Sequence, residues 1–356
     1  MARKTLYERL RDVDRRWIYL CIALAVVVPL VFHLYFPETP TPMTQAVFDK
    51  IENLPDGSRV LIDFSYDPAS MPEIEPMATA FIRHCFLKKH KIYAVALWPV
   101  APQLASDAFN DAVDFFRKID PARRIVYGED YVNLGFKSGQ QGVIKVMLTN
   151  LALLYSTDIN GVNIADIPMM KGVTNLKSFD LIVSVSAGTP GTKEWVQFGS
   201  VPAGVPLVAG TTSVFAPLLY PYYPAQMHGI LGGLKSASEY DALVFDKLKP
   251  LLRKALRQAP DLLKDEIARL NGDLGLEPAV KAKMIAEKND ALRAAEKADF
   301  ANLTDRQLVE LAGPLLGYTQ KGITRMGPQA VAHLVVILFI VLGNITFFID
   351  RRRRRR

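Results

Sequence analysis

RVLIDFSY, at Arg59–Tyr66, is the first of several short apolar runs that alternate with longer segments of helical periodicity. A run of roughly four to eight such residues, bounded by turn residues, is typical of a strand buried on both faces of a parallel sheet. Similar strands are predicted at Ile92–Trp98, Arg124–Tyr127, Leu181–Ser186 and Pro206–Ala209. Helices are predicted at Gln45–Asn53, Ile74–His90, Ala105–Ile119, Gln140–Tyr155, Lys193–Gly199 and Ala225–Leu234.

This alternation predicts an α/β fold, in which helices cover both faces of a parallel sheet. We expect a doubly wound, Rossmann-like domain over 55–243. The following stretch, 244–316, is rich in Ala, Leu, Lys and Glu and predicts an added α-helical segment, interrupted near Gly272 and Pro278. The sequence leaves open whether this segment packs on the sheet domain or on a neighbouring molecule.

Both ends of the chain carry long uncharged apolar runs, Trp17–Phe36 and Val331–Ile349. A helix rises about 1.5 Å per residue, so about 20 residues cross a hydrocarbon core of about 30 Å. The two runs therefore predict two transmembrane helices. A cleaved signal peptide is the alternative for the first run, but the run is long for one, and PETPTPMTQ after it offers no small-residue cleavage site.

Positive charge is concentrated in the two tails outside these runs. The tails hold twelve of the 43 basic and four of the 36 acidic residues, which leaves 31 basic and 32 acidic residues in 17–349. Lys and Arg beside a span stay in the cytoplasm, so we expect a two-pass plasma (inner) membrane protein with both termini cytoplasmic and the central domain outside. The near-neutral centre argues against nucleic acid as a partner.

The expected organisation has eight parts. They are a basic tail (1–16), transmembrane helix 1 (17–36), a linker and short helix (37–54), the α/β domain (55–243), the helical segment (244–316), a linker (317–330), transmembrane helix 2 (331–349) and an arginine tail (350–356). The two cysteines, Cys21 and Cys85, lie in different parts. The domain must therefore be stabilised by its packed core rather than by disulfides.

Ligands of doubly wound sheets bind beyond the carboxyl ends of the strands, near the point where the winding reverses. The turn after the fourth expected strand is rich in glycine and threonine, and such a turn before a helix offers N–H groups and hydroxyls to a phosphate or carboxylate. The predicted ligand-binding residues are Ser65, Asp67, Ser186, Gly188, Thr189, Gly191 and Thr192. The alternative is that these residues only build turns, as any strand-to-helix connection requires.

No familiar catalytic pattern accompanies this turn. It lacks the GxGxxG and GxxxxGK[ST] spacings of nucleotide sites, so no cofactor is expected. It also departs from the nucleophile elbow, because Ser184 stands where that motif requires glycine. The histidines His84, His90 and His228 lack zinc-ligand spacing, so no metal is expected, and catalytic residues cannot be assigned.

The segment Gly210–Gly233 (GTTSVFAPLLYPYYPAQMHGILGG) combines aromatic residues with three prolines that forbid a continuous helix. Bulky amphipathic side chains in a loop are common at protein interfaces and at the depth of lipid headgroups. We therefore predict an interface with a membrane-protein partner, a second copy of the chain, or the lipid bilayer. Its residues are Phe215, Tyr220, Tyr222 and Tyr223. Core packing of the loop is the alternative.

Two functions remain compatible with the sequence. The first is a double-anchored membrane protein whose extracytoplasmic domain binds a protein partner or small anionic ligand as a non-catalytic subunit of a membrane assembly. The second is a membrane-tethered transferase or hydrolase acting on phosphorylated or carboxylated envelope substrates. The absence of a convergent acid, base and nucleophile in the sequence favours the first.

Overall fold

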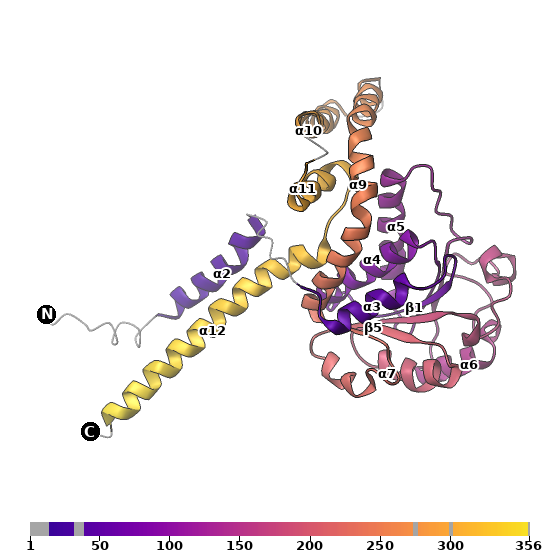
Figure 1. The fold of residues 1–356 in the computed structure, drawn as a ribbon, viewed down its shortest axis with the longest axis horizontal. Helices are drawn as coiled ribbons and strands as arrows, with labels where there is room; N and C mark the ends of the chain where they lie inside the picture. The colour runs from indigo at the N-terminus through magenta and orange to yellow at the C-terminus, as the bar shows by residue number, and fades with distance from the viewer. Residues whose placement is uncertain (1–13, 32–38, 273–276, 299–301, 355–356) are drawn as a thin grey trace. The chain divides into compact units, whose positions relative to one another are not determined.

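A six-stranded parallel sheet forms the centre of the chain. The computed structural model describes residues 14–31, 39–272, 277–298 and 302–354. The strands are β1 (Arg59–Ser65), β2 (Lys91–Ala96), β3 (Tyr131–Phe136), β4 (Leu181–Ser186), β5 (Leu207–Thr211) and β6 (Ile230–Gly232). All neighbouring strands are parallel, in the order β3-β2-β1-β4-β5-β6. Helices flank this sheet (Figure 1), so the α/β fold is confirmed.

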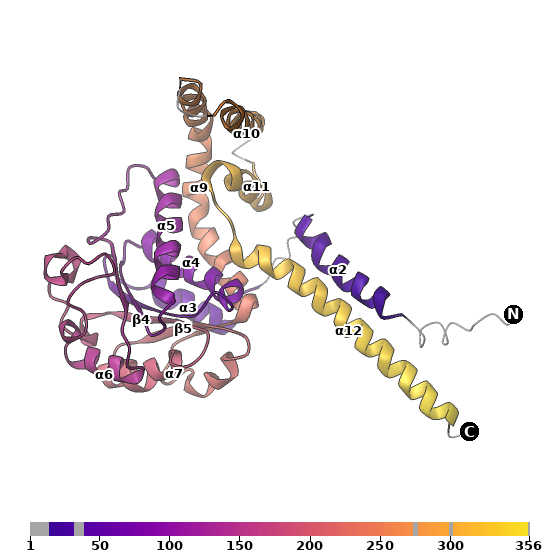
Figure 2. The ribbon, with the colours of Figure 1, turned by 180° about the vertical axis from the view of Figure 1, so that it is seen from behind.

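Helices precede, connect and follow the strands. They are α2 (Arg15–Val31), α3 (Pro42–Glu52), α4 (Met71–Leu87), α5 (Ala101–Ile119), α6 (Gln141–Thr149), α7 (Thr192–Trp195), α8 (Val201–Ala203), α9 (Gly233–Gly272), α10 (Pro278–Lys297), α11 (Asp305–Leu316) and α12 (Lys321–Arg354). Figures 1 and 2 show α4 and α5 on one face of the sheet and α6 and α7 on the other.

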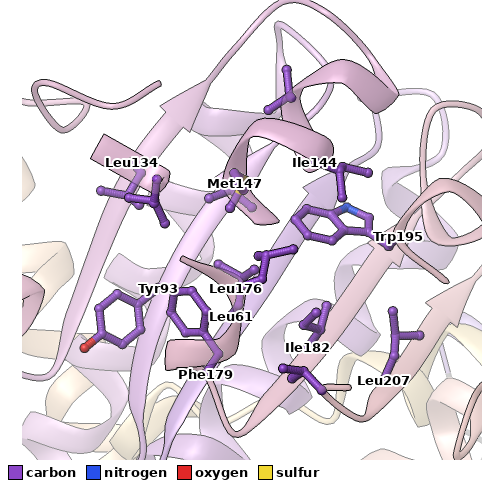
Figure 3. Close-up of a cluster of buried hydrophobic side chains, with 14 of the residues drawn as sticks. Leu61, Tyr93, Leu134, Ile144, Met147, Leu176, Phe179, Ile182, Trp195 and Leu207 are labelled. Carbon is purple, nitrogen blue, oxygen red and sulfur yellow. The ribbon is translucent and has the colours of Figure 1, made fainter. Parts of the chain in front are cut away.

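The sheet has an apolar layer on each face, because alternate side chains of a strand point to opposite sides. Figure 3 shows the cluster on the face of α6 and α7. Its members include Leu61, Tyr93, Ile182, Leu207, Met147 and Trp195. On the opposite face, the ring of Phe64 lies 6.0 Å from that of Phe109 in α5. Burial on both faces explains why the strands are continuous apolar runs rather than alternating ones.

The third strand lies later in the chain than the sequence predicts. Arg124–Tyr127 contributes only an isolated bridge between Tyr127 and Tyr131, and β3 occupies the stretch that we expected to be a loop. Asn133 within β3 obscured this strand. Its buried amide donates hydrogen bonds to the Pro102 carbonyl at 2.9 Å and to the Ser106 hydroxyl at 3.0 Å, which satisfies a polar group inside the sheet.

The helix predicted at Ala225–Leu234 is also wrong. That stretch contains β6, and α9 begins only at Gly233. Three residues are too few for a strand to show its periodicity. Close packing is evident at Gly229, where a Cβ atom would lie 2.6 Å from Cγ2 of Val47 in α3.

Helix α9 is 40 residues long and extends beyond the sheet (Figure 1). Its first turns pack against α4, and its later turns pack against α10 and α11. Ion pairs between Lys264 and Glu296 and between Lys288 and Glu266 join α9 to α10. We call the described residues of 244–316 the helical arm. The expected boundary between 243 and 244 falls inside α9, so the arm is continuous with the sheet domain.

The chain divides into two compact units, Glu38–Gly322 and the combination of Met1–Pro37 with Ile323–Arg356. Among the described residues, one helix is long and apolar enough to cross a membrane, over Lys321–Arg352. The other expected span coincides with α2 as far as Val31, and its residues 32–36 lie outside the described ranges. Length and composition thus support one membrane helix, and the two-span arrangement remains a prediction.

Candidate functional site at the carboxyl edge of the sheet

The winding of the sheet reverses between β1 and β4, which are neighbours. β1 continues through α4 towards β2, whereas β4 continues through α7 towards β5 on the other side. The loops that follow these strands, 66–70 and 187–191, therefore diverge. Ligands of parallel sheets bind at this point, so its polar residues are the candidate site.

A network of buried polar side chains lies at this edge. The strand register pairs Asp63 with Ser184 and Ser65 with Ser186. The Ser65 hydroxyl donates to Oδ1 of Asp63 at 2.6 Å, and the Ser184 hydroxyl donates to Oδ2 at 3.0 Å. The Thr192 hydroxyl joins the hydroxyls of Ser184 and Ser186 at 3.0 and 2.9 Å. All five side chains are fully buried.

Burial raises the pKa of Asp63 to about 7, although hydrogen bonds from Ser65 and Ser184 favour the carboxylate. The Trp195 indole N–H also lowers this pKa, but its geometry falls short of a hydrogen bond. The Tyr155 hydroxyl is buried and has no hydrogen-bond partner among the described residues. The site thus consists of one carboxyl group with a raised pKa and hydroxyls that bond to it and to one another.

The glycine- and threonine-rich turn already uses its backbone donors. The N–H of Gly191 donates to Oε2 of Glu194 at 2.8 Å, and that of Thr192 donates to the Ser186 hydroxyl at 3.1 Å. A Cβ at Gly191 would lie 2.4 Å from the Gly188 carbonyl oxygen, so the turn is tight. The carboxylate of Glu194 thus takes an N–H group that an anion would need.

The other predicted ligand residues lie apart from this network. Asp67 closes the turn before α4, because its Oδ1 accepts from the N–H of Ser70 at 2.9 Å and from its hydroxyl at 2.7 Å. These bonds lower the pKa of Asp67. Thr189 is exposed, and Gly188 is partly buried. The structure therefore brings together Ser65, Ser186 and Thr192, with Gly191 beside them, but not Asp67 or Thr189.

The proline-rich aromatic segment forms two short 3-10 turns, Ala216–Leu218 and Tyr220–Tyr222. We call residues 212–227 the aromatic loop. Of the four predicted interface residues, three are partly buried against the core: Phe215, Tyr222 and Tyr223. The Tyr222 hydroxyl also accepts from Nε2 of Gln197 at 2.7 Å. Tyr220 is 47% exposed, Leu218 is 60% exposed and Val214 is 86% exposed. The exposed residues of the loop therefore differ from the predicted interface residues, of which only Tyr220 is exposed.

Sequence reasoning missed a second buried network, between α3, α4 and α9. Nε2 of His84 lies 2.9 Å from Oε2 of Glu52, and Nδ1 lies 2.7 Å from the Tyr240 hydroxyl. Burial lowers the pKa of His84 despite Glu52, so the ring is neutral, donating to Glu52 and accepting from Tyr240. Hydrogen bonding to His84 and Lys247 lowers the pKa of Glu52 to about 2. Glu52, His84 and Tyr240 are too far apart in the sequence for a local pattern to predict this network.

Two acidic residues of α9 hold both chain ends of the Glu38–Gly322 unit. Oε2 of Glu239 accepts from the N–H of Thr41 at 2.9 Å and from the Thr44 hydroxyl at 2.7 Å. Oδ2 of Asp241 accepts from the N–H of Gly322 at 3.2 Å. We call residues 235–241 the docking turns. Burial raises the pKa of Asp241 to about 6, although the nearby Arg83 opposes this shift.

Arg83 reinforces the second attachment. Its Nη1 donates to the Thr319 carbonyl at 3.0 Å, and its guanidinium lies 4.9 and 5.0 Å from the ring centres of Phe115 and Tyr318. A cation held between aromatic faces and bonded to the backbone fixes the path of the chain before α12.

Comparison with known protein families, curated proteins and solved structures finds no match to this chain. Within the described ranges, no group of His, Cys, Asp and Glu could hold a metal ion. The function must therefore be inferred from the geometry and chemistry of the residues themselves.

Proposed function

We propose that this chain is a membrane protein anchored at both ends, with both termini in the cytoplasm and the α/β domain outside. In this proposal the domain is a non-catalytic subunit of a membrane assembly and binds a protein partner. The strand order β3-β2-β1-β4-β5-β6 is that of doubly wound, Rossmann-like sheets, which supports the finer fold assignment.

The observation that carries the non-catalytic proposal is that the polar groups of β1, β4 and the turn after β4 bond to one another at the switch point. Asp63, Ser65 and Ser184 are buried and bond to one another, and the N–H groups of Gly191 and Thr192 are taken within the chain. A binding or catalytic site needs groups that a ligand can reach. The geometry therefore favours a protein partner over the anionic ligand that the sequence suggested.

The helical arm is the element that we propose for this partner. Its ion pairs hold α10 on α9, and the arm extends beyond the sheet (Figure 1). Leu262 and Val280 on the arm are large apolar side chains that remain exposed. Apolar anchors surrounded by charged residues are typical of transient protein interfaces.

An assembly experiment tests this proposal. We expect the full chain, extracted from its native membrane in mild detergent, to migrate as part of a larger complex. The double change Leu262→Lys and Val280→Lys should release the chain from the complex, because it places charges in a desolvated contact, and should leave the thermal midpoint nearly unchanged. Val201→Lys, at another exposed apolar position, is the matched control. A chain that migrates alone from native membranes would contradict the proposal.

One observation favours an enzyme as the second candidate. The pKa of Asp63, raised to about 7 by burial, suits a proton acceptor, and the carboxyl group lies next to two serine hydroxyls. This candidate requires the edge to open to a substrate, since Ser65 and Ser184 are not exposed. Reaction of either serine with a fluorophosphonate probe would support it over the non-catalytic proposal.

A further inference from the structure

The aromatic loop presents an uncharged surface at the carboxyl edge of the sheet. No Asp, Glu, Lys or Arg occurs between Glu194 and Lys235. The loop exposes two apolar side chains, Val214 and Leu218, and one amphipathic side chain, Tyr220. Such a surface can leave bulk water without the cost of desolvating a charge.

The loop is fixed to the start of α9. Glu73 accepts from the N–H of Ser213 at 2.9 Å through Oε1. A Cβ at Gly233 would lie 2.7 Å from Cβ of Ser213, and a Cβ at Gly232 would lie 3.8 Å from the Tyr220 hydroxyl. The exposed side chains are therefore carried by a loop that packs against the junction of β6 and α9.

The docking turns that hold both chain ends follow this junction directly. Asp241 is eight residues beyond Gly233, which is about 12 Å along a helix. Thr41 and Gly322, bound by Glu239 and Asp241, thus lie within a few turns of the aromatic loop. Both connections to the expected membrane spans leave the domain beside this loop.

These connections are short. Val331 is nine residues beyond Gly322, which is about 14 Å along a helix. Thr41 is five residues beyond Phe36, and an extended chain of that length reaches at most about 18 Å. If both runs span the membrane, as the proposed function requires, the docking turns lie within about 20 Å of the hydrocarbon, and the headgroup region occupies part of that distance.

We propose that the aromatic loop docks on the lipid bilayer, with Val214, Leu218 and Tyr220 at the depth of the headgroups. This inference rests on the proposed two-span anchoring. Tyrosine is enriched at that depth because its ring is apolar and its hydroxyl is polar. The exposed surface of three side chains is small beside the roughly 800 Å² per partner of a standard protein interface. This small surface is enough for contact with lipid, because the two anchors keep the local lipid concentration high.

Fluorescence quenching in nanodiscs tests this docking. The full chain carries a polarity-sensitive dye at Val214→Cys, in a Cys21→Ser background, in discs of phosphatidylcholine and phosphatidylglycerol. Cys85 is buried and should not react with the dye. Leu153→Cys is the matched control, because Leu153 is a 73% exposed apolar side chain in a turn that is not part of the aromatic loop. We expect blue-shifted emission and quenching by spin-labelled lipid at Val214, but iodide quenching alone at Leu153.

Two other results would overturn the docking. Iodide quenching at Val214 equal to that at Leu153 means that the loop faces water. Protection at Val214 from both iodide and spin-labelled lipid means that a protein, including a second copy of the chain, covers the loop. A dye on the native Cys21 tests the two-span anchoring separately from the docking of the aromatic loop. If spin-labelled lipid quenches Cys21 but not Val214, only the docking is wrong; if Cys21 is not quenched, α2 does not enter the bilayer and the two-span anchoring is wrong.

Discussion

Asp63 is fully buried between Ser65 and Ser184, and burial raises its pKa to about 7 from an ordinary value of 3.8. Between these two pH values the folded chain keeps a proton that the unfolded chain has released. Stability from this group is therefore complete below about pH 4 and is lost as pH rises towards 7, by at most about 4 kcal/mol. Asp241, with a pKa raised to about 6, contributes with the same sign up to that pH.

Glu52 has the opposite effect. Its pKa is lowered from 4.5 to about 2, so its stabilising contribution is present above 4.5 and is lost as pH falls towards 2. The three groups together predict a stability maximum near pH 4 to 5, with a decline on either side.

The change Asp63→Asn tests the first of these effects. It removes the ionisation and keeps the shape. One serine hydroxyl can still donate to the amide oxygen, and the other can turn to accept from the amide NH2 group. We expect the thermal midpoint of the variant, measured in detergent, to rise relative to that of the original chain as pH increases from 4 to 7. The exposed Asp166→Asn is the control for loss of a charge. A midpoint difference that does not vary with pH would mean that Asp63 does not titrate in this range.

At the level of elements, the sequence predicted four of the six strands with useful accuracy. β1, β2, β4 and β5 are apolar runs buried on both faces, and this burial is what their composition reports. β3 was missed because Asn133 and Gly135 interrupt its apolar pattern, and β6 because it is too short. Both strands depend on partners that are distant in sequence.

The candidate site was predictable only in part. Ser65 and Ser186 lie at the ends of β1 and β4, so they are adjacent because these strands are neighbours in the sheet. The hydrogen bonds within the site could not be foreseen, because they depend on the register that sets Asp63 opposite Ser184 and on the bond from the Gly191 N–H to Glu194. The networks of Glu239 and Asp241 join residues about 200 and 80 positions apart, and no local pattern reports such contacts.

Glu239 contributes to the attachment of helix α3 to α9. The Glu239 carboxylate is buried; burial opposes its ionisation, but bonds from Lys235, Thr41 and Thr44 lower its pKa overall. Glu239→Ala leaves these donors without their acceptor, and we expect a loss of about 2–4 kcal/mol in the free energy of unfolding. Hydrogen exchange should accelerate in α3 and stay unchanged in α5.

The control for this change is Glu310→Ala, which removes an exposed carboxylate paired with Arg306 and should cost less than about 1 kcal/mol. Equal exchange in α3 for the original chain and Glu239→Ala would show that the docking turns do not hold the start of the domain.

At the scale of the whole molecule, the two chain ends of the Glu38–Gly322 unit are bound by Glu239 and Asp241, which lie within one turn of α9. Two connections that leave from one turn of a helix can enter the same bilayer without deforming the domain. This arrangement supports anchoring at both ends.

Labelling of cysteines in whole cells tests the central claim of anchoring at both ends most directly. The full chain in a Cys21→Ser background carries either Leu153→Cys, exposed on the domain, or Ala2→Cys in the basic tail. Cells are treated with a membrane-impermeant maleimide before and after permeabilisation. We predict that Leu153→Cys is labelled in intact cells and that Ala2→Cys is labelled only after permeabilisation. Labelling of Leu153→Cys only after permeabilisation, or of Ala2→Cys in intact cells, would contradict the account.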